Sequence, residues 1–386
     1  MVTFVSQLLL FCILVTQSLF IAIIRFEPET TYKFAIPIFV SIIAFFCAPI
    51  QGGLSDYYCR KKALIFALIV TLISSVFFLF WLWQNNILYL IIYIVMFGVA
   101  GNVNPIVLSA YKDMTKQFIN FRFFMAMVLF YYFVGDFSHV VSRFFIHSGA
   151  MMELSYFLLV VCIILVYLVY KDTKDIDLNV RDPKERISIL HEVKYIYHNF
   201  LKHKSFMLGF FGYFFLELSI YQFTFRNEAF RHFLTQLVPF EMIAGTFIGV
   251  LFLKFAKFSD EKIFFSGLII VLICFLILFF SKIFGWTNNI LLISTITLLG
   301  TSYSITYSCV YCLFTRKRHH HDHGKVFGML ASADYISYLI AIGIVALSFK
   351  VPVQRVWLMS LSLFVVGIVF FLFFLHHDKK ITKIPR

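Results

Sequence analysis

The sequence is 386 residues long, with 61% hydrophobic and only 14% charged residues. Soluble globular proteins carry about 25% charged and about 45–50% apolar residues, and the surface of a water-soluble fold cannot hide a larger apolar excess. The mean hydropathy of +0.88 therefore excludes a soluble globular protein and predicts an integral membrane protein.

Twelve apolar segments are long enough to cross a bilayer, for which a helix needs about 20 residues. In chain order they cover residues 2–24, 33–54, 63–83, 88–109, 122–145, 151–170, 205–225, 237–256, 263–283, 290–313, 325–348 and 353–375. The first has no basic region before it and no small-residue cleavage site after it, so we interpret it as a retained helix. The sequence predicts an all-α membrane protein with twelve transmembrane helices.

One long, charged connector separates two groups of six segments. It divides the chain into an N-terminal six-helix bundle (1–170), a cytoplasmic central loop (171–204), a C-terminal six-helix bundle (205–375) and a cytoplasmic tail (376–386).

The distribution of Lys and Arg over the connectors predicts the orientation. With the N-terminus in the cytoplasm, 25 of the 33 basic residues lie on the inner side and 8 on the outer side. Both termini are therefore expected to be cytoplasmic, in a bacterial cytoplasmic (inner) membrane. The net charge of +13 has the same origin, because a basic inner face meets anionic lipid. No nucleic-acid partner is expected.

The two groups of six segments resemble copies of one another. The seventh segment begins about 203 residues after the first, and landmarks recur near that offset: Ser55-Asp56 and Ser259-Asp260, Gly98 and Gly300, Arg122 and Lys325. Together with the hydropathy, these pairs indicate an internal duplication that yields two pseudo-symmetric bundles, the plan of many secondary transporters.

A motif lies between the second and third segments, where the chain reads Gly52-Gly53-Leu54-Ser55-Asp56-Tyr57-Tyr58-Cys59-Arg60-Lys61-Lys62. It resembles the signature loop of the major facilitator superfamily, G-x-L-[SA]-D-R-x-G-R-[RK]-[RK], in sequence and in place. Tyr57 and Cys59 depart from the pattern. The next cytoplasmic connector, with Ala110, Asp113 and Arg122, resembles the family's A-x-x-x-D…R pattern. The resemblance implies two six-helix bundles and transport by alternating access.

The resemblance also implies a gating role for Gly52, Gly53, Asp56, Arg60, Lys61 and Arg122. A carboxylate can accept hydrogen bonds from the free amides at a helix N-terminus. By family resemblance, Asp56 binds the start of the eleventh helix near Gly324 and Lys325, closing the cytoplasmic side. The alternative is a basic loop that merely orients the second helix. Tyr57 replaces the basic residue of the family pattern, so no salt bridge is expected from this position.

Three acids within the apolar segments are candidates for proton coupling: Asp136, Glu217 and Asp334. An ionisable group in a membrane segment costs about 2.5–3.5 kcal/mol on insertion scales, and burial favours the protonated form of a carboxyl group. A proton carrier must bind a proton on one side of the membrane and release it on the other, and a buried carboxyl group that can exist in both forms suits this task. The alternative is a structural acid, hydrogen-bonded to a neighbouring helix or paired with Arg143.

In the family that the motif resembles, helices 1, 4, 7 and 10 line the central cavity. Here they carry Gln17, Asn102, Asn104, Tyr221, Gln222, Tyr303 and Tyr307. These side chains suit a small polar or zwitterionic solute. They are equally compatible with polar contacts between helices.

The sequence contains no motif for a cofactor or for catalysis. His319-His320-His321-Asp322-His323 matches no standard zinc spacing, so we interpret it as a solvated basic loop without metal. A Walker loop, H-E-x-x-H and G-x-S-x-G are absent, which disfavours both ATP-driven transport and the remaining rival, a polytopic membrane enzyme.

The direction of transport is predicted from the fifth segment. Proton-antiporting drug and metabolite exporters of the family carry a Gly- and Pro-rich stretch there, whereas this segment has one Gly and no Pro in residues 130–145. This favours uptake of a small organic solute in symport with protons, by a monomer, over export by proton antiport.

Overall fold

The structure is a computed structural model, and it describes residues 6–13, 16, 32–57, 59–100, 103–115, 121–128, 150–170, 204–226, 238–285, 289–316, 323–347 and 353–381. All regular secondary structure in these ranges is helical, and no strand occurs in them. The prediction of an all-α membrane protein is confirmed.

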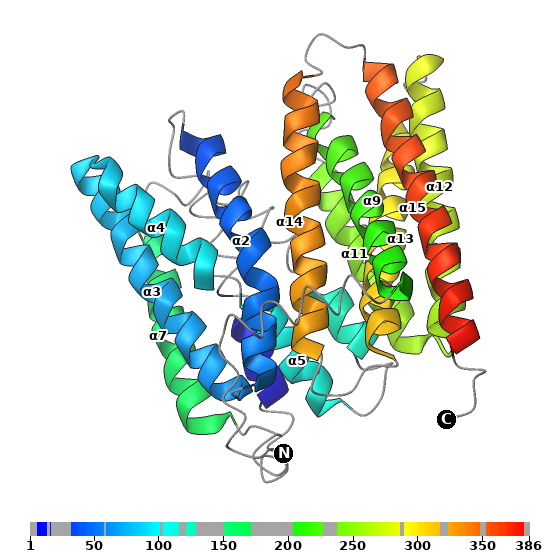
Figure 1. Cartoon of the computed structure of the whole chain (residues 1–386). Coiled ribbons are helices and arrows are strands. Elements are labelled where there is room, and N and C mark those ends of the chain that lie inside the picture. Colours follow the sequence, from blue (N-terminus) through cyan, green and yellow to red (C-terminus); the bar gives the residue numbers. More distant parts are fainter. Residues whose placement is uncertain are drawn as a thin grey trace. The chain divides into compact units, whose positions relative to one another are not determined.

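The helices follow the predicted segments closely (Figure 1). They are α2 (Tyr32–Tyr57), α3 (Arg60–Gln84), α4 (Ile87–Ala100), α5 (Asn104–Met114), α7 (Ala150–Val169), α9 (Lys204–Arg226), α11 (Val238–Phe255), α12 (Asp260–Ile283), α13 (Asn289–Thr315), α14 (His323–Leu347) and α15 (Val353–Ile381). The predicted segments 2–24 and 122–145 are described in part, with helical residues 6–13, 16 and 121–128.

The segment predicted as one helix over 88–109 corresponds to two helices, α4 and α5. Pro105 lies in the first turn of α5, where a missing N–H is tolerated and the fixed φ suits a helix start. The proline therefore favours a new helix start at this place. Together the two helices form one candidate membrane span, Ile87–Met114.

Chain contacts divide the protein into two compact units. Unit 1 comprises Met1–Lys116, Ser138–Phe200 and Arg318–Tyr335, and unit 2 comprises Gln117–Phe137, Leu201–Lys317 and Ile336–Arg386. Each unit thus contains most of one half of the sequence and one short segment of the other half. The short segments include the start of α14 in unit 1 and residues 121–128 in unit 2.

Unit 1 is built on α3, which packs against α4 and α7, while α2 packs against α4 and α5 (Figure 1). Its aromatic core lies between α3 and α4, where the rings of Phe78 and Tyr93 are 5.0 Å apart and those of Tyr93 and Phe97 are 5.5 Å apart. Buried aromatic rings bring a large apolar area to such a contact, so the packing of α3 against α4 stabilises this unit.

Unit 2 packs α9 against α15, and α11 and α12 against α13 (Figure 1). The α9–α15 contact is close because Gly212 of α9 faces the ring of Phe371. Small residues allow helices to approach closely in membranes. Phe371 in turn packs on Phe264 of α12, with ring centroids 4.7 Å apart.

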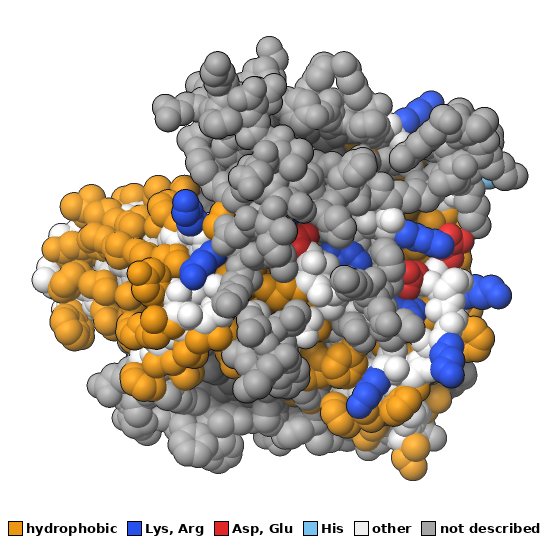
Figure 2. All heavy atoms as spheres, turned by 90° about the horizontal axis from the view of Figure 1, so that it is seen from below, with side chains coloured by type: hydrophobic (Ala, Val, Ile, Leu, Met, Phe, Trp, Pro, Cys, Tyr) orange, Lys and Arg blue, Asp and Glu red, His pale blue; other side chains and the backbone are white. Residues whose placement is uncertain are grey.

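The helices expose many large apolar side chains. Phe66, Phe157, Phe255 and Ile290 are 63%, 64%, 73% and 78% exposed. Figure 2 shows Lys and Arg side chains on one face beside wide hydrophobic areas. Exposed apolar surface on this scale marks an interaction surface. Within the described ranges, seven helices are long and apolar enough to cross a membrane, so lipid is the solvent of this surface.

Candidate functional site

The carboxylate of Asp56, near the end of α2, caps the start of α14. Its Oδ1 accepts a hydrogen bond of 3.0 Å from the amide of Gly324, and its Oδ2 accepts one of 2.8 Å from the amide of Lys325. The first turn of α14 contains no acidic residue of its own. Asp56 therefore provides, from a distant part of the chain, the acceptor that the free amides and the helix dipole need. This is the contact that the sequence motif implied.

Two glycines allow α2 and α14 to approach this closely. A Cβ atom on Gly52 would collide with the backbone carbonyl of Gly324, and a Cβ atom on Gly324 would collide with the carbonyl of Gly52. One turn further along, a Cβ atom on Gly328 would likewise collide with the backbone carbonyl of Ala48. The two backbones are in contact over about one turn, so the first glycine of the motif has a steric role.

Arg60 connects this contact to α5. Its guanidinium forms an ion pair with Asp56, donates to the hydroxyl of Ser55, and donates from Nε to Oδ2 of Asp113 at 3.0 Å. The other oxygen of Asp113 lies 3.0 Å from Nδ1 of His323. The side chains of Arg60, Asp113 and His323 are 0%, 4% and 3% exposed. We call Asp56, Arg60, Asp113 and His323 the latch cluster.

The prediction that His323 belongs to a solvated loop is wrong. This residue begins α14 and is buried against Asp113, because a carboxylate on α5 meets the first turn of α14. Nothing in the local run of histidines indicates a partner 210 positions earlier. His319, His320, His321 and Asp322 lie outside the described residues. Among the residues that the structure covers, no three His, Cys, Asp or Glu side chains could together hold a metal ion.

Unit 2 contains a related cluster around Arg122. Its guanidinium donates to the backbone carbonyls of Ala256 and Phe258 at 3.3 and 3.2 Å and pairs with Asp260 at 3.2 Å. The side chains of Arg122 and Asp260 are 2% and 11% exposed. The sequence comparison matched Asp260 with Asp56 and Arg122 with Lys325. In space, each acid contacts the basic residue from the other half of the chain. Asp260 pairs with Arg122, and Asp56 accepts a hydrogen bond from the amide of Lys325. This agrees with an internal duplication.

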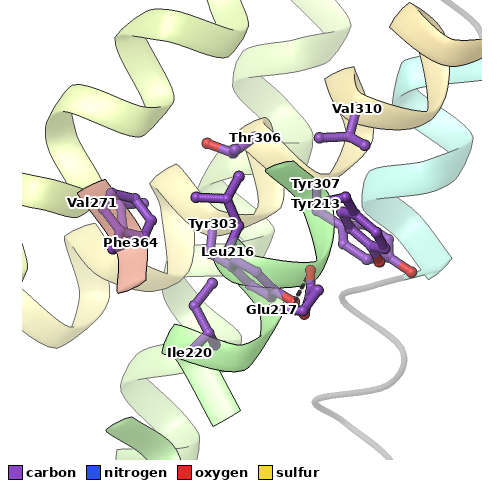
Figure 3. Close-up of a pocket in the computed structure, with 10 residues that line it drawn as sticks. All are labelled: Tyr213, Leu216, Glu217, Ile220, Val271, Tyr303, Thr306, Tyr307, Val310 and Phe364. Carbon is purple, nitrogen blue, oxygen red and sulfur yellow. Dashed lines mark hydrogen bonds between the residues drawn. The ribbon is translucent and has the colours of Figure 1, made fainter. Parts of the chain in front are cut away.

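A small pocket in unit 2 contains Glu217 (Figure 3). The residue lies near the middle of α9 and is 2% exposed. The hydroxyl of Tyr303 on α13 donates to its carboxylate, with distances of 2.9 Å to Oε2 and 3.2 Å to Oε1. The remaining lining is formed by Tyr213, Leu216, Ile220, Val271, Thr306, Tyr307, Val310 and Phe364. The free space is about 10 Å³, roughly the volume that one water molecule needs.

The tyrosines continue beyond the pocket along α13. The hydroxyl of Tyr307 lies 3.1 Å from that of Tyr311, which lies 3.5 Å from the hydroxyl of Tyr213 on α9. Tyr311 and Tyr213 were missed in the sequence. The spacing of Tyr303, Tyr307 and Tyr311 at intervals of four residues could have revealed the row, because residues four apart lie on one face of a helix.

Other predicted cavity residues on α9 have partners outside the lining of this pocket. The ring of Tyr221 packs edge-on against Tyr338, with centroids 5.6 Å apart, and Gln222 accepts a hydrogen bond from Ser360 at 3.3 Å. The Gln222 contact is of the polar kind between helices that was the alternative, and the Tyr221 contact is aromatic packing within unit 2.

The remaining predicted residues are placed elsewhere or are not described. Asp334 is half-buried on α14, and Asn104 is the first residue of α5. Gly53 is buried, and the amine of Lys61 lies 5.7 Å from the ring centre of Tyr167. Gln17, Asn102 and Asp136 lie outside the described residues.

Known proteins share both the sequence pattern and the fold of this chain. A family model described as Major Facilitator Superfamily matches residues 1–342. The chain belongs to the major facilitator superfamily. This major facilitator is therefore a multi-pass membrane protein, and its family points to a transporter of small molecules.

Solved structures of the superfamily match over nearly the whole chain. A human organic anion transporter, MFSD10, has a TM-score of 0.73 at 14% identity, covering 96% of this chain and 98% of its own. The E. coli fucose:proton symporter FucP has a TM-score of 0.73 at 12% identity, and the match covers 97% of this chain and 99% of the FucP chain. A bacterial homologue of the iron transporter ferroportin has a TM-score of 0.73 at 14% identity, and the match covers 96% of this chain and 98% of the homologue. No curated protein sequence matches the chain. At these identities the likeness shows the fold alone.

Proposed function

We propose that this transporter takes up a small organic solute together with protons, and that Glu217 is its proton site. The observation that carries the proposal is a carboxyl group that is 2% exposed near the middle of α9, within the predicted membrane segment 205–225, with a hydroxyl group donating to it. An intramembrane carboxyl is costly unless it is neutral or hydrogen-bonded. The hydrogen bond from Tyr303 provides for the ionised form, and burial favours the protonated form.

The size of the Glu217 pocket supports a proton as its occupant. Its free space of about 10 Å³ suits a water molecule, whereas sites for small organic molecules are about 300–1,000 Å³. The organic solute would therefore bind outside this pocket. The description of FucP as a fucose:proton symporter supports the proposal, although one fold hosts many substrates.

The latch cluster supports a gate between α2, α5 and α14. We propose that its bonds hold the cytoplasmic side closed while the outer side is open, and break when the protein opens inward. Breaking an ion pair while its charges stay buried costs about 3–5 kcal/mol. The gate would therefore open only when water reaches these side chains. The same proposal places Lys61 and both termini in the cytoplasm of a bacterial cell, with the monomer as the working unit.

Transport in liposomes with a pH-sensitive dye inside tests the proposal. Single sugars, amino acids and carboxylic acids would be added outside to the wild type, to Glu217→Gln and to the matched variant Asp334→Asn. We expect one solute class to acidify the lumen, Glu217→Gln to abolish this, and Asp334→Asn to retain it.

The direction of the pH change in the lumen and the behaviour of Glu217→Gln distinguish the possible outcomes. Alkalinisation of the lumen by an entering solute would indicate proton antiport, the mechanism of an exporter. Solute entry without any pH change would exclude proton coupling. Acidification that survives in Glu217→Gln would assign the proton to another acid.

A further inference from the structure

A row of tyrosine hydroxyls leads from Glu217 towards one end of unit 2. Tyr303, Tyr307 and Tyr311 share one face of α13, and Tyr213 of α9 faces them (Figure 3 shows all but Tyr311). Between Tyr303 and Tyr311 the helix rises by about 12 Å. Tyr311 is four residues from the C-terminal end of α13, the end that the predicted topology places at the cytoplasmic side.

Two of the three steps along the row are hydrogen-bond contacts. Tyr303 binds the carboxylate of Glu217 at 2.9 Å, and the hydroxyls of Tyr307 and Tyr311 are 3.1 Å apart. Between Tyr303 and Tyr307 the ring centroids are 5.9 Å apart. Both rings line the pocket that has room for about one water molecule. A water molecule in this pocket would be the bridge between the two hydroxyls that a proton path requires.

We propose that Tyr303, Tyr307 and Tyr311, with Tyr213 beside them, conduct the proton between Glu217 and the C-terminal end of α13. The inference rests on the proposed function, since it assumes that Glu217 takes up and releases protons. Tyr303 has a direct contact with Glu217, whereas Tyr307, Tyr311 and Tyr213 act through it as positioning and relay residues.

Tyrosine hydroxyls suit this task because each is both a donor and an acceptor. A proton arriving on the lone pair of one oxygen lets that oxygen pass its own hydrogen to the next oxygen. One O–H bond forms and one breaks at every step, and the last proton reaches the carboxylate of Glu217. No hydroxyl keeps a charge after the transfer. Among the other lining side chains, Leu216, Val310 and Phe364 are apolar, and the hydroxyl of Thr306 donates to the carbonyl of Ser302 at 2.8 Å.

The test measures the rate at which Glu217 becomes protonated and needs no transported solute. The full-length protein in liposomes receives a rapid light-induced pH drop, and time-resolved infrared spectroscopy follows the carbonyl stretch of protonated carboxyl groups. The band that Glu217→Gln lacks belongs to Glu217. Tyr307→Phe and Tyr311→Phe each remove one hydroxyl and keep the ring. Tyr156→Phe is the matched control, because its hydroxyl donates to the carbonyl of Ser75 at 2.7 Å in unit 1.

We expect Tyr307→Phe and Tyr311→Phe to slow the Glu217 band by at least about tenfold while its final amplitude stays the same. Tyr156→Phe should leave the rate unchanged. A merely structural role of the hydroxyls would change thermal unfolding and not this rate. Unchanged rates in both variants, measured on samples with wild-type thermal unfolding, would overturn the path alone. If Glu217→Gln removes no band at any pH, the proton site itself is overturned.

Discussion

Gly52 and Gly324 are the residues at which α2 and α14 come closest, and each excludes a side chain on the other. The hydrogen bonds of Asp56 depend on this approach, because its carboxylate must reach two amides of α14 at once. At the scale of single residues, the latch cluster thus depends on two things. Gly52 and Gly324 must have no side chain, and the carboxylate of Asp56 must accept hydrogen bonds from the two amides.

We predict that Gly52→Ala destabilises the protein by about 1–3 kcal/mol, the usual cost of overpacking. The added methyl group meets a backbone carbonyl, which cannot rotate away. Thermal unfolding of the purified protein in detergent measures the effect. Gly343→Ala is the control, since a Cβ there meets no atom within 4 Å. Equal unfolding midpoints for the two variants would contradict the close approach.

His323 provides a second test at this scale. Replacing it by Ala removes a hydrogen-bond partner of Oδ1 of the buried Asp113, and a hydrogen bond to a charged group contributes about 1.5–3 kcal/mol. His323→Asn, which keeps a donor near the position of Nδ1, should recover most of the loss. Unfolding measurements on the two variants decide. If Ala and Asn are equally stable, the hydrogen bond to Asp113 contributes nothing.

At the scale of elements, the two clusters connect helices that are far apart in the sequence. Asp56 joins α2 to the start of α14, and Arg60 joins α3 to α5. Arg122 joins residues 121–128 to the carbonyl end of α11 and the first turn of α12. These contacts lie within the compact units. They give a physical reason why each unit contains a short segment from the other half of the chain.

A double-mutant cycle on Arg122→Ala and Asp260→Ala measures the second cluster. We predict a favourable coupling of about 0.5–3 kcal/mol, typical of residues in one network, because both side chains are nearly buried. The pair Arg316 and Glu261, 3.1 Å apart but 47% and 26% exposed, should show at most about 1 kcal/mol. A larger coupling in the exposed pair would argue against burial as the source of the strength.

At the scale of the whole molecule, the lipid environment and the family are shown, while the orientation in the membrane is a prediction. The apolar helix surfaces require lipid, but they are the same for either orientation. Orientation depends on the distribution of Lys and Arg, which stay on the cytoplasmic side during insertion.

Single cysteines in a variant whose seven native cysteines are replaced by Ser test the orientation. Lys62 and Gln84 are exposed at opposite ends of α3. In intact cells, a membrane-impermeant maleimide should label Gln84→Cys and should label Lys62→Cys only after permeabilisation. The reverse pattern would show that the basic connectors face outwards.

The sequence by itself determined the lipid solvent, the place of the helices and the family. Hydropathy and the motif at Gly52–Lys62 carry this information locally, because a span depends on the apolar character of about 20 consecutive residues. The motif also implied the contact of Asp56 with the start of α14 through the family resemblance. The break before α5 was readable in principle from Pro105.

The tertiary structure alone decided which of these residues have partners. His323 is buried because Asp113 meets it, and Glu217 has a hydroxyl donor because α9 and α13 place Tyr303 opposite it. The partners are 210 and 86 residues apart. Local spacing shows which residues share a helix face, but a contact between faces depends on how helices pack, and that follows from the whole set of side chains between them.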